Sequence, residues 1–264
     1  MGAKYAISAA GGNVTNIEIV PQALSREEYA ERGHRLMKAL SIHKPEQSGF
    51  LVKPDNVTPH FEMAGGELCV NALRAAAILA TGIPREERCL TMTVSGLKSP
   101  VECLVIPLGK IWGDVKYRVT ASFSGMVREV KVIEYDGIRA TIVDLGGIVH
   151  VIVSAPFPKD YENVHGKICE AFGLSGREAV GVVWIEDAGD AIAIHPVVWV
   201  RDVDTFFYET SCGSGSIAAV VATLSTDGSK DVIQPTGFRM TVTMRGGIIE
   251  LSSDIEVLGY EFGL

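Results

Sequence analysis

Long basic runs and long apolar runs are both missing from this chain. Its 264 residues include 24 Lys and Arg against 32 Asp and Glu, and no basic run exceeds two residues. A nucleic-acid footprint needs clustered Lys and Arg, so we expect no nucleic-acid partner. No window holds 18 uninterrupted apolar residues. We therefore expect neither a membrane-spanning helix nor a membrane partner.

The cysteines also lack the spacing of a metal site. None of the five lies in a C-x-x-C pair, so we expect no structural zinc or other metal. Their number is odd and the chain is long enough to form a core without disulfides, which predicts reduced thiols. The first fifteen residues have no extended apolar stretch of the kind found in secretory signals. These features together predict a cytoplasmic protein.

Three pairs of matching segments indicate an internal repeat. GGNVTNIEIV at Gly11 resembles GGIVHVIVSA at Gly146, and REEYAERGHRLMKAL around Tyr29 resembles PKDYENVHGKICEAF around Tyr161. CVNALRAAAILA at Cys69 resembles CGSGSIAAVVAT at Cys212. The matches run in the same order at similar separations, so we interpret the chain as two copies of one unit.

Each copy alternates strand and helix patterns, which predicts an α+β fold with two domains facing each other. Ser25 and Glu28 form a capping box, and a second helix is expected near residues 159–172. Strands are expected at 89–96, 116–123, 128–137, 179–187 and 238–253, the last with a hairpin at Gly246-Gly247. The predicted domains are residues 1–118 and 119–264. The sequence leaves open whether the C-terminal strands pack with the second domain or return to the first.

Cys69 and Cys212 each open an apolar helical pattern. A helix start offers free backbone N–H groups and a partial positive charge, which favour an anion. We therefore expect a lowered pKa for each thiol, and we expect the same N–H groups to hold a substrate carboxylate. Small residues such as Gly213 and Ser214 allow the carboxylate to approach the backbone closely.

If the two copies pack around a pseudo-twofold axis, Cys69 and Cys212 meet across the interdomain cleft. One thiolate can then remove a proton from one face of a carbon, while the opposite thiol returns a proton to the other face. This arrangement predicts racemisation without a cofactor. The competing interpretation is that a cysteine in an apolar helix is a small core residue.

The two motifs resemble those of diaminopimelate epimerase and its relatives, the cofactor-independent amino-acid racemases. In that family the first motif is Cys-Gly-Asn-Gly-x-Arg, and the segment from Cys69 to Arg74 matches at Cys, Asn and Arg. The second is Cys-Gly-(Thr/Ser)-Gly, which Cys212–Gly215 matches in full. The resemblance covers the whole chain. It implies two pseudo-symmetric domains, each a β-sheet wrapped around a central helix, with the active site in the cleft between them, and a homodimer.

The resemblance also implies substrate contacts. The expected set comprises Asn13, Val70, Asn71, Gly213 and Ser214, with Glu46 and Glu209 added as polar contacts. For Asn13 and Asn71 the alternative is a turn or cap residue. For Glu46 the alternative is a solvated loop charge.

Departures from the family pattern affect the expected substrate. Ile148 stands where the epimerases have an Asn that helps to hold the distal amino-acid end, and the Glu-Arg pair before the second cysteine is out of register. A substrate with a single amino-acid end is therefore favoured over diaminopimelate. The segment EMAGGELCVNALR resembles the histidine racemases of metallophore pathways, so histidine is the favoured substrate.

Other functions remain open at this stage. The chain could be a diaminopimelate or 2,4-diaminobutyrate epimerase or racemase, or an isomerase that acts on another carbon acid. It could also be a non-catalytic amino-acid-binding protein, because Val70 and Ala72 replace family glycines.

Overall fold

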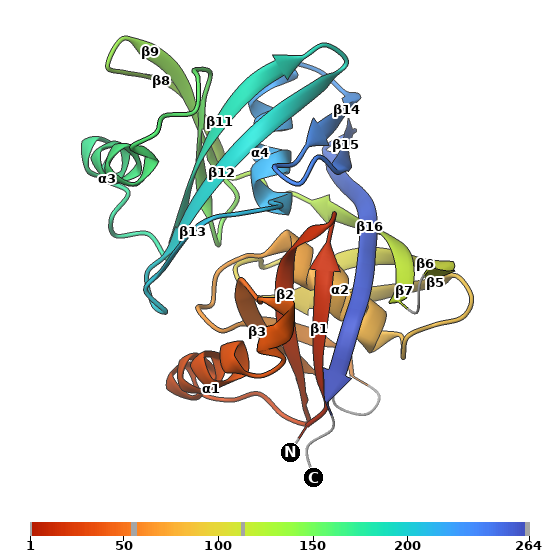
Figure 1. The fold of residues 1–264 in the computed structure, drawn as a ribbon. Coiled ribbons are helices and arrows are strands. Elements are labelled where there is room, and N and C mark those ends of the chain that lie inside the picture. The colour runs from red at the N-terminus through yellow and green to blue at the C-terminus, as the bar shows by residue number, and fades with distance from the viewer. Residues whose placement is uncertain (1, 54–56, 112–113, 262–264) are drawn as a thin grey trace.

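A computed structural model describes residues 2–53, 57–111 and 114–261. Within these ranges, the first half of the chain forms seven strands, two α-helices and a 3₁₀ turn (Figure 1). These are β1 (Lys4–Ala9), β2 (Gly12–Val20), α1 (Arg26–Lys38), η1 (Ser41–His43), β3 (Gln47–Val52), β4 (His60–Met63), α2 (Val70–Ala80), β5 (Arg88–Val94), β6 (Val101–Ile111) and β7 (Asp114–Ser124).

The second half adds nine strands and two helices. These are β8 (Glu129–Tyr135), β9 (Ile138–Asp144), β10 (Val149–Val153), α3 (Tyr161–Ala171), β11 (Ala179–Ala188), β12 (Ala191–Val200), β13 (Thr205–Tyr208), α4 (Gly213–Thr223), β14 (Gly228–Ile233), β15 (Arg239–Arg245) and β16 (Ile248–Glu261). The α+β class expected from the sequence is confirmed.

Strand β16 joins the two halves of the sheet. It pairs antiparallel with β1 along one edge and with β7 along the other. Because β1 to β7 are neighbours in order, β16 closes these strands into a ring. The same strand also pairs with β15, from which the sheet continues through β14, β12, β11 and β10 to β9 and β8. The predicted boundary at residues 118 and 119 lies within β7, and the division into domains stays a prediction.

Two helices lie at the centre of the fold. All residues of α2 except the last are buried, and so are the first eight residues of α4. Small and apolar residues make up most of both helices, which is typical of helices buried in a core. Helix α4 contacts β9, β10, β11, β12, β15 and β16, and the N-terminal regions of α2 and α4 approach each other (Figure 1).

Local signals in the sequence account for several element ends. Ser25 caps α1, and its capping box with Glu28 is present in full. Helix α3 begins at Tyr161, two residues later than expected, after an Asp160 that makes no side-chain cap. Gly246 and Gly247 both have positive φ, as a tight β15–β16 hairpin requires. In α1, Tyr29 and Leu36 are buried, whereas Leu40 lies beyond the helix.

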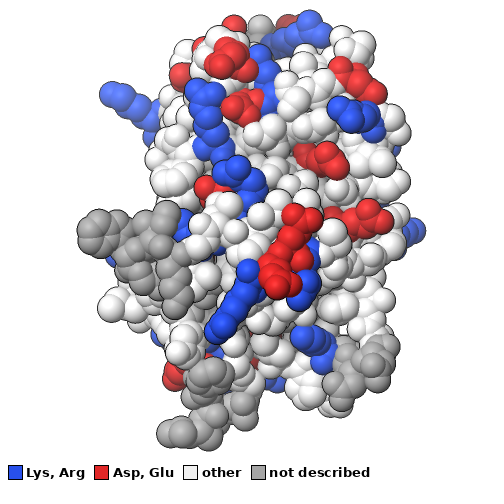
Figure 2. Space-filling view, turned by 90° about the vertical axis from the view of Figure 1, so that its right-hand side faces the viewer, with Lys and Arg blue, Asp and Glu red and all other residues white. Residues whose placement is uncertain are grey.

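Charges of both signs are mixed on the molecular surface. Figure 2 shows Lys and Arg interspersed with Asp and Glu on one face of the molecule. Within the described ranges, no helix has the length and apolar character needed to cross a bilayer. The same ranges contain no group of three or more His, Cys, Asp and Glu placed to hold a metal ion.

Candidate active site

Cys69 and Cys212 occupy the same position on two different helices. Cys69 is the N-cap of α2 and Cys212 is the N-cap of α4, each with extended backbone dihedrals. The Cys69 sulfur accepts a hydrogen bond from the backbone N–H of Ala72 at 3.4 Å. The Cys212 sulfur accepts one from Gly215 at 3.3 Å. Both thiols therefore point back over the first turn of their own helix.

The two cysteines line one cavity, which we call the cysteine cavity. Its lining residues are Asn13, Gln47, Glu67, Leu68, Cys69, Asn71, Ile148, Val198, Val200, Glu209, Cys212, Gly213 and Ser214. Both halves of the chain contribute to it. Of the substrate contacts expected from the sequence, five lie in this lining: Asn13, Asn71, Gly213, Ser214 and Glu209.

The ends of the two helices meet beside this cavity. A Cβ on Gly213 would lie 3.1 Å from the Val70 side chain, so the first residues of α4 and α2 are in contact. The backbone N–H groups of Val70, Asn71, Gly213 and Ser214 donate no hydrogen bond within the described part of the chain. Four donors at two helix N-termini make a suitable place for a carboxylate.

A chain of amides holds the two helix ends in place. Asn71 Nδ2 donates to Asn13 Oδ1 at 3.0 Å and to the Ser211 carbonyl oxygen at 3.1 Å, which links the two halves. Its Oδ1 accepts from Arg74 Nη2 at 2.7 Å, and Arg74 also donates to Ser253 Oγ. Arg74 is fully buried and burial lowers its pKa to about 10. These contacts fix the orientation of the Asn71 side chain.

Asn13 has a left-handed backbone with φ of 45°, a conformation that Asn tolerates better than most residues. Its backbone N–H donates to Glu46 Oε1 and to Thr210 Oγ1. Thr210 Oγ1 in turn donates to Glu46 Oε1. Glu46 is therefore half-buried between the two halves and is not a solvated loop charge. Its oxygens are already engaged by protein donors.

Gln47 connects this network to the first thiol. The Cys69 thiol donates to Gln47 Oε1 at 3.2 Å. Gln47 Nε2 donates to Asn13 Oδ1 and to Thr15 Oγ1, both at 2.8 Å. Because the amide is held at its nitrogen, its oxygen is fixed toward Cys69. From the sequence, either Glu46 or Gln47 was a candidate contact for a polar substrate side chain, and nothing local indicated that Gln47 holds the Cys69 thiol.

Two carboxyl groups in the cavity have unusual acidities. Burial raises the pKa of Glu67 to about 7 and that of Glu209 to about 8. Glu67 is 6% exposed and its Oε2 has no hydrogen-bond partner. Both groups therefore exchange protons near neutral pH. Glu67 was not predicted from the sequence, because Glu in a Gly-Gly-Glu loop is ordinarily solvated.

The expected lowering of the thiol pKa values is wrong for this state of the protein. Burial, and after it the neighbouring Glu209 carboxylate, raise the pKa of Cys69 to about 12. Burial and Glu209 likewise raise the pKa of Cys212 well above its ordinary value. The backbone donors at the helix ends do lower both values, but they are outweighed. Both cysteines are thus neutral thiols at pH 7.

His150 supports the second helix end from behind. Its Nε2 lies 2.9 Å from Ser214 Oγ, and Ser214 Oγ lies 3.7 Å from the Cys212 sulfur. Complete burial lowers the pKa of His150 to about 3, so the ring stays neutral. Its contact with Ser214 gives it a positioning role at the start of α4.

A second cavity continues from the first, and we call it the outer cavity. Its lining residues are Gly33, His34, Met37, Glu46, Gln47, Ser48, Ala64, Gly65, Glu67, Val198, Val200, Val203, Thr205, Phe207 and Glu209. The two cavities share Gln47, Glu67, Val198, Val200 and Glu209. Val198 and Val200 come from β12, and nothing in their apolar strand pattern distinguished them as cavity walls. Ile148 lies in the cysteine cavity, where it offers only apolar surface.

Comparison with known proteins adds independent information. A family model described as "Histidine racemase CntK N-terminal domain" matches residues 11–257. Two curated histidine racemases from strains of Fusobacterium nucleatum are 26% and 27% identical over 191 residues. The matches cover 69% of this chain and 67% and 66% of those proteins, so the match spans about two thirds of their length.

Solved structures share the fold. A predicted epimerase from Pseudomonas aeruginosa superposes with a TM-score of 0.70 at 13% identity, covering 100% of this chain and 99% of the other. A phenazine biosynthesis PhzF family protein from Enterococcus faecalis gives a TM-score of 0.57 at 15% identity, covering 98% and 97%. At these identities the likeness shows the fold alone. The match over residues 11–257, in contrast, shows that the chain belongs to the histidine racemase family and is an isomerase, an amino-acid racemase.

Proposed function

We propose that the protein racemises histidine, with Cys69 and Cys212 as the two acid/base groups. The observation that carries this proposal is the shared position of the two cysteines, each the N-cap of a central helix and both lining one cavity. The two Fusobacterium nucleatum proteins named as histidine racemases support the choice of substrate.

The substrate carboxylate binds at the meeting point of α2 and α4. The unpaired N–H groups of Val70, Asn71, Gly213 and Ser214 converge there, and the partial positive charges of two helix ends add to them. As the α-carbon loses its proton, negative charge develops on the carboxylate oxygens. Donors fixed at that place stabilise the transition state more than the ground state.

Proton transfer then uses one thiol on each face of the α-carbon. One cysteine, as thiolate, takes the α-proton, and the electron pair left behind delocalises into the carboxylate. The other cysteine, as thiol, donates its proton to the opposite face of the carbon. The first sulfur ends as a thiol and the second as a thiolate, so the reverse reaction starts from the opposite state. No electrons are transferred.

Substrate binding supplies the condition for thiolate formation. The Glu209 carboxylate is one cause of the high pKa of both cysteines. We infer that the α-ammonium group of the substrate binds next to Glu209 and Glu67. Both carboxyl groups line the cysteine cavity, and the described lining residues of that cavity include no Lys or Arg. Pairing with the ammonium group favours the ionised form of Glu209 and offsets its negative charge, which would otherwise oppose ionisation of the thiols. The enzyme thus keeps neutral thiols until a substrate is bound.

The imidazole side chain is assigned to the outer cavity. Val198, Val200 and Gln47 line both cavities, whereas Glu46 and His34 line the outer cavity alone. The apolar walls Val198, Val200 and Ile148 disfavour diaminopimelate, whose distal carboxylate would lie against them unpaired. They leave 2,4-diaminobutyrate as the second candidate, because its distal ammonium group could pair with Glu46.

A non-catalytic binding protein is less well supported. That hypothesis rested on Val70 and Ala72, whose side chains were expected to obstruct the carboxylate. Val70 is fully buried against Gly213, and its backbone N–H is without a partner. The side chain therefore packs between the helices and leaves the donor free.

A substrate panel in heavy water tests the function. Reduced protein is incubated with L-histidine, D-histidine, L-2,4-diaminobutyrate and diaminopimelate, and deuterium at the α-carbon and product chirality are read together. We expect deuterium incorporation and inversion with both enantiomers of histidine. Exchange with another carbon acid only, or tight amino-acid binding without exchange, would overturn the assignment.

We also infer that the two halves are copies of one unit related by a pseudo-twofold axis. Support comes from the matching order of a peripheral helix, strands and a buried helix that begins with Cys69 or Cys212. A homodimer and a cytoplasmic location are part of the same proposal. Light scattering of the purified protein and cell fractionation test them separately.

A further inference from the structure

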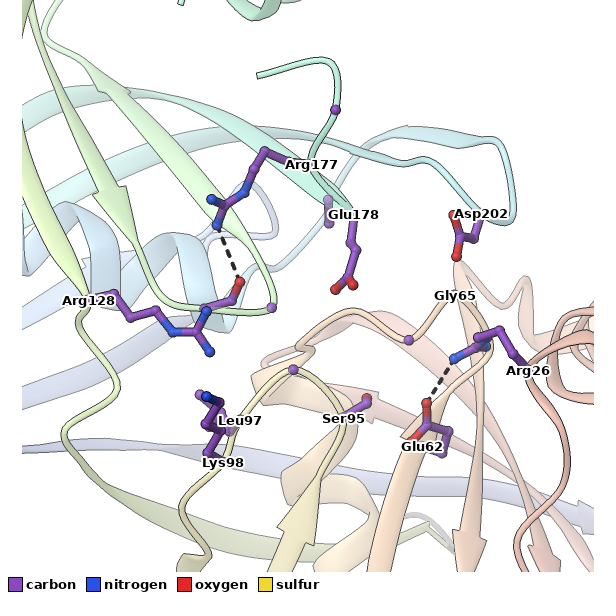
Figure 3. Close-up of a pocket in the computed structure, with 16 residues that line it drawn as sticks. Arg26, Glu62, Gly65, Ser95, Leu97, Lys98, Arg128, Arg177, Glu178 and Asp202 are labelled. Atoms are coloured by element: carbon purple, nitrogen blue, oxygen red, sulfur yellow. Dashed lines mark hydrogen bonds and ion pairs between the residues drawn. The ribbon is translucent and has the colours of Figure 1, made fainter. Parts of the chain in front are cut away.

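A third cavity, large enough for a small molecule, lies between the two halves and away from the cysteines. We call it the arginine cavity (Figure 3). Its volume is about 660 Å³, and its charged lining residues include Lys98, Arg128, Arg177, Glu62, Glu178 and Asp202. That volume is within the range of small-molecule sites. The racemase mechanism uses none of these residues.

The charges in this cavity are segregated. Figure 3 shows Lys98, Arg128 and Arg177 on one side, and Glu178, Asp202 and Glu62 on the other. Glu62 pairs with Arg26, so that the Arg26 charge is already compensated. On the basic side only Arg177 has an acidic partner, Asp144 at 2.8 Å. Among the described residues Lys98 and Arg128 form no ion pair, so two positive charges stay uncompensated.

The loop from Asp144 to Gly147 builds the basic side. Asp144 Oδ2 accepts from Arg177 Nη2, and its Oδ1 accepts from the backbone N–H of Gly146. A Cβ on Gly146 would lie 2.9 Å from the Nε, Cζ and Nη2 atoms of Arg128 alike. The Arg128 guanidinium therefore lies flat over Gly146, at a position that any side chain would block. Both guanidinium groups are seated by one loop.

We propose that the arginine cavity binds a small dianion, either a phosphate or a dicarboxylate, between Lys98, Arg128 and Arg177. Two uncompensated charges match a doubly charged oxyanion, and the planar guanidinium groups suit its oxygen atoms. Lys98 belongs to the first half and the two arginines to the second. The bound anion thus bridges the halves.

Backbone contacts connect the proposed anion site to the cysteine cavity. Gly96 and Gly147 touch backbone to backbone, because a Cβ on Gly96 would lie 2.7 Å from Gly147 Cα. Leu68 N–H, one residue before Cys69, is directed to the Gly147 carbonyl oxygen at 3.5 Å. Gly147 lines the arginine cavity. Ile148, which follows Gly147 in the chain, lines the cysteine cavity together with Leu68. An anion that holds Lys98 and Arg128 together would therefore act on a backbone contact that borders both cavities.

Calorimetric titration tests the binding. Inorganic phosphate and malonate are titrated separately into the full chain at constant ionic strength. We expect saturable binding of one anion per chain, weakened about tenfold by Arg128→Gln and by Lys98→Gln, since each removes a charge-assisted contact. Lys131→Gln, which removes an exposed charge from β8, serves as the matched control and should leave affinity unchanged. The tighter of the two anions identifies the ligand as phosphate-like or carboxylate-like.

Lack of saturable binding by both anions overturns the proposal, as does binding that neither Arg128→Gln nor Lys98→Gln weakens. These results do not depend on activity, so they are separable from any failure of the proposed racemase mechanism. The coupling is tested by the KM for the amino acid. A saturating anion should lower KM about fivefold in the wild type, within the range of ordinary allosteric coupling, and leave KM of Arg128→Gln unchanged. An anion that binds without altering the wild-type KM contradicts the coupling.

Discussion

The amide oxygen of Asn71 lies 2.6 Å from the point that a Cβ on Gly213 would occupy. The first residue of α4 therefore has to be glycine for α2 and α4 to approach each other as closely as they do. This contact brings the free N–H groups of the two helices together, and the proposed carboxylate site depends on it.

Replacing Gly213 with alanine should therefore impair both stability and catalysis. The added methyl group forces the helix ends apart, at a cost of about 1–3 kcal/mol in the free energy of unfolding. KM for histidine should rise because the four N–H donors no longer converge. Urea unfolding and steady-state kinetics measure the two effects.

Gly166→Ala is the matched control for that change. Gly166 lies within α3, and a Cβ there meets nothing within 4 Å. Alanine is favoured over glycine in a helix interior by about 1 kcal/mol, so this variant should be more stable than the wild type with unchanged KM. Equal stability of Gly213→Ala and the wild type would show that the two helix ends are not in close contact.

Stability should fall as the pH rises through neutrality. Glu67 titrates near pH 7 in the folded protein, against an ordinary value of 4.5. A raised carboxyl pKa means that the folded state binds the extra proton, so this stabilisation is complete below pH 4.5 and is lost as the pH passes about 7. One such group contributes a slope of up to about 1.4 kcal/mol per pH unit within that window.

Urea unfolding between pH 5 and 8 measures this slope. Glu67→Gln should flatten it, whereas Glu134→Gln, which removes an exposed carboxylate from β8, should not. Identical slopes for wild type and Glu67→Gln would mean that Glu67 is not protonated in the folded state.

Features of this site that leave a pattern in neighbouring residues of the sequence could be predicted. The N-cap positions of Cys69 and Cys212 were evident from sequence, because small apolar residues follow each cysteine directly. The capping box of Ser25 and Glu28 is equally local, and it was confirmed. Asn13 and Asn71 were found through the family resemblance, and the structure places their amides 3.0 Å apart.

The remaining features arise only from tertiary packing. Glu67 has an ordinary loop sequence and becomes unusual because the second half of the chain covers it. Val198 and Val200 read as strand residues, and only the pairing of β12 turns them toward the cavity. The thiol pKa values were predicted in the wrong direction, because a helix start is visible in the sequence but the burial of the thiol and its proximity to Glu209 are not.

The two cysteines should also make the enzyme sensitive to oxidation. Both thiols line one small cavity, so a disulfide between Cys69 and Cys212 can form after modest movement. We expect oxidation to abolish activity and a reductant to restore it, with the disulfide located by mass spectrometry. Cys89 is exposed, and the experiment is therefore done in a Cys89→Ser background to avoid intermolecular crosslinks. Full activity with that disulfide present would argue against a catalytic role of the pair.

Glu46 and Glu209 should respond differently to conversion to the amide. Glu46 is engaged by Asn13 and Thr210, so Glu46→Gln should mainly lower stability. Glu209 is proposed to pair with the substrate ammonium group, so Glu209→Gln should mainly raise KM. Parallel measurements of unfolding and kinetics separate the two. Equal KM values for Glu209→Gln and the wild type would contradict the proposed ammonium contact.

The two-thiol mechanism is tested most directly by exchange at the α-carbon in Cys69→Ser and Cys212→Ser. Each variant is incubated in heavy water with L-histidine and with D-histidine, and deuterium incorporation is followed separately from inversion. Loss of one acid/base group should reduce inversion at least about a hundredfold in both variants, while the remaining thiol still exchanges the α-proton of one enantiomer. The enantiomer that exchanges should be opposite in the two variants, and Cys89→Ser should behave as the wild type. Inversion at the wild-type rate in both variants would contradict the assignment of Cys69 and Cys212 as the acid/base pair.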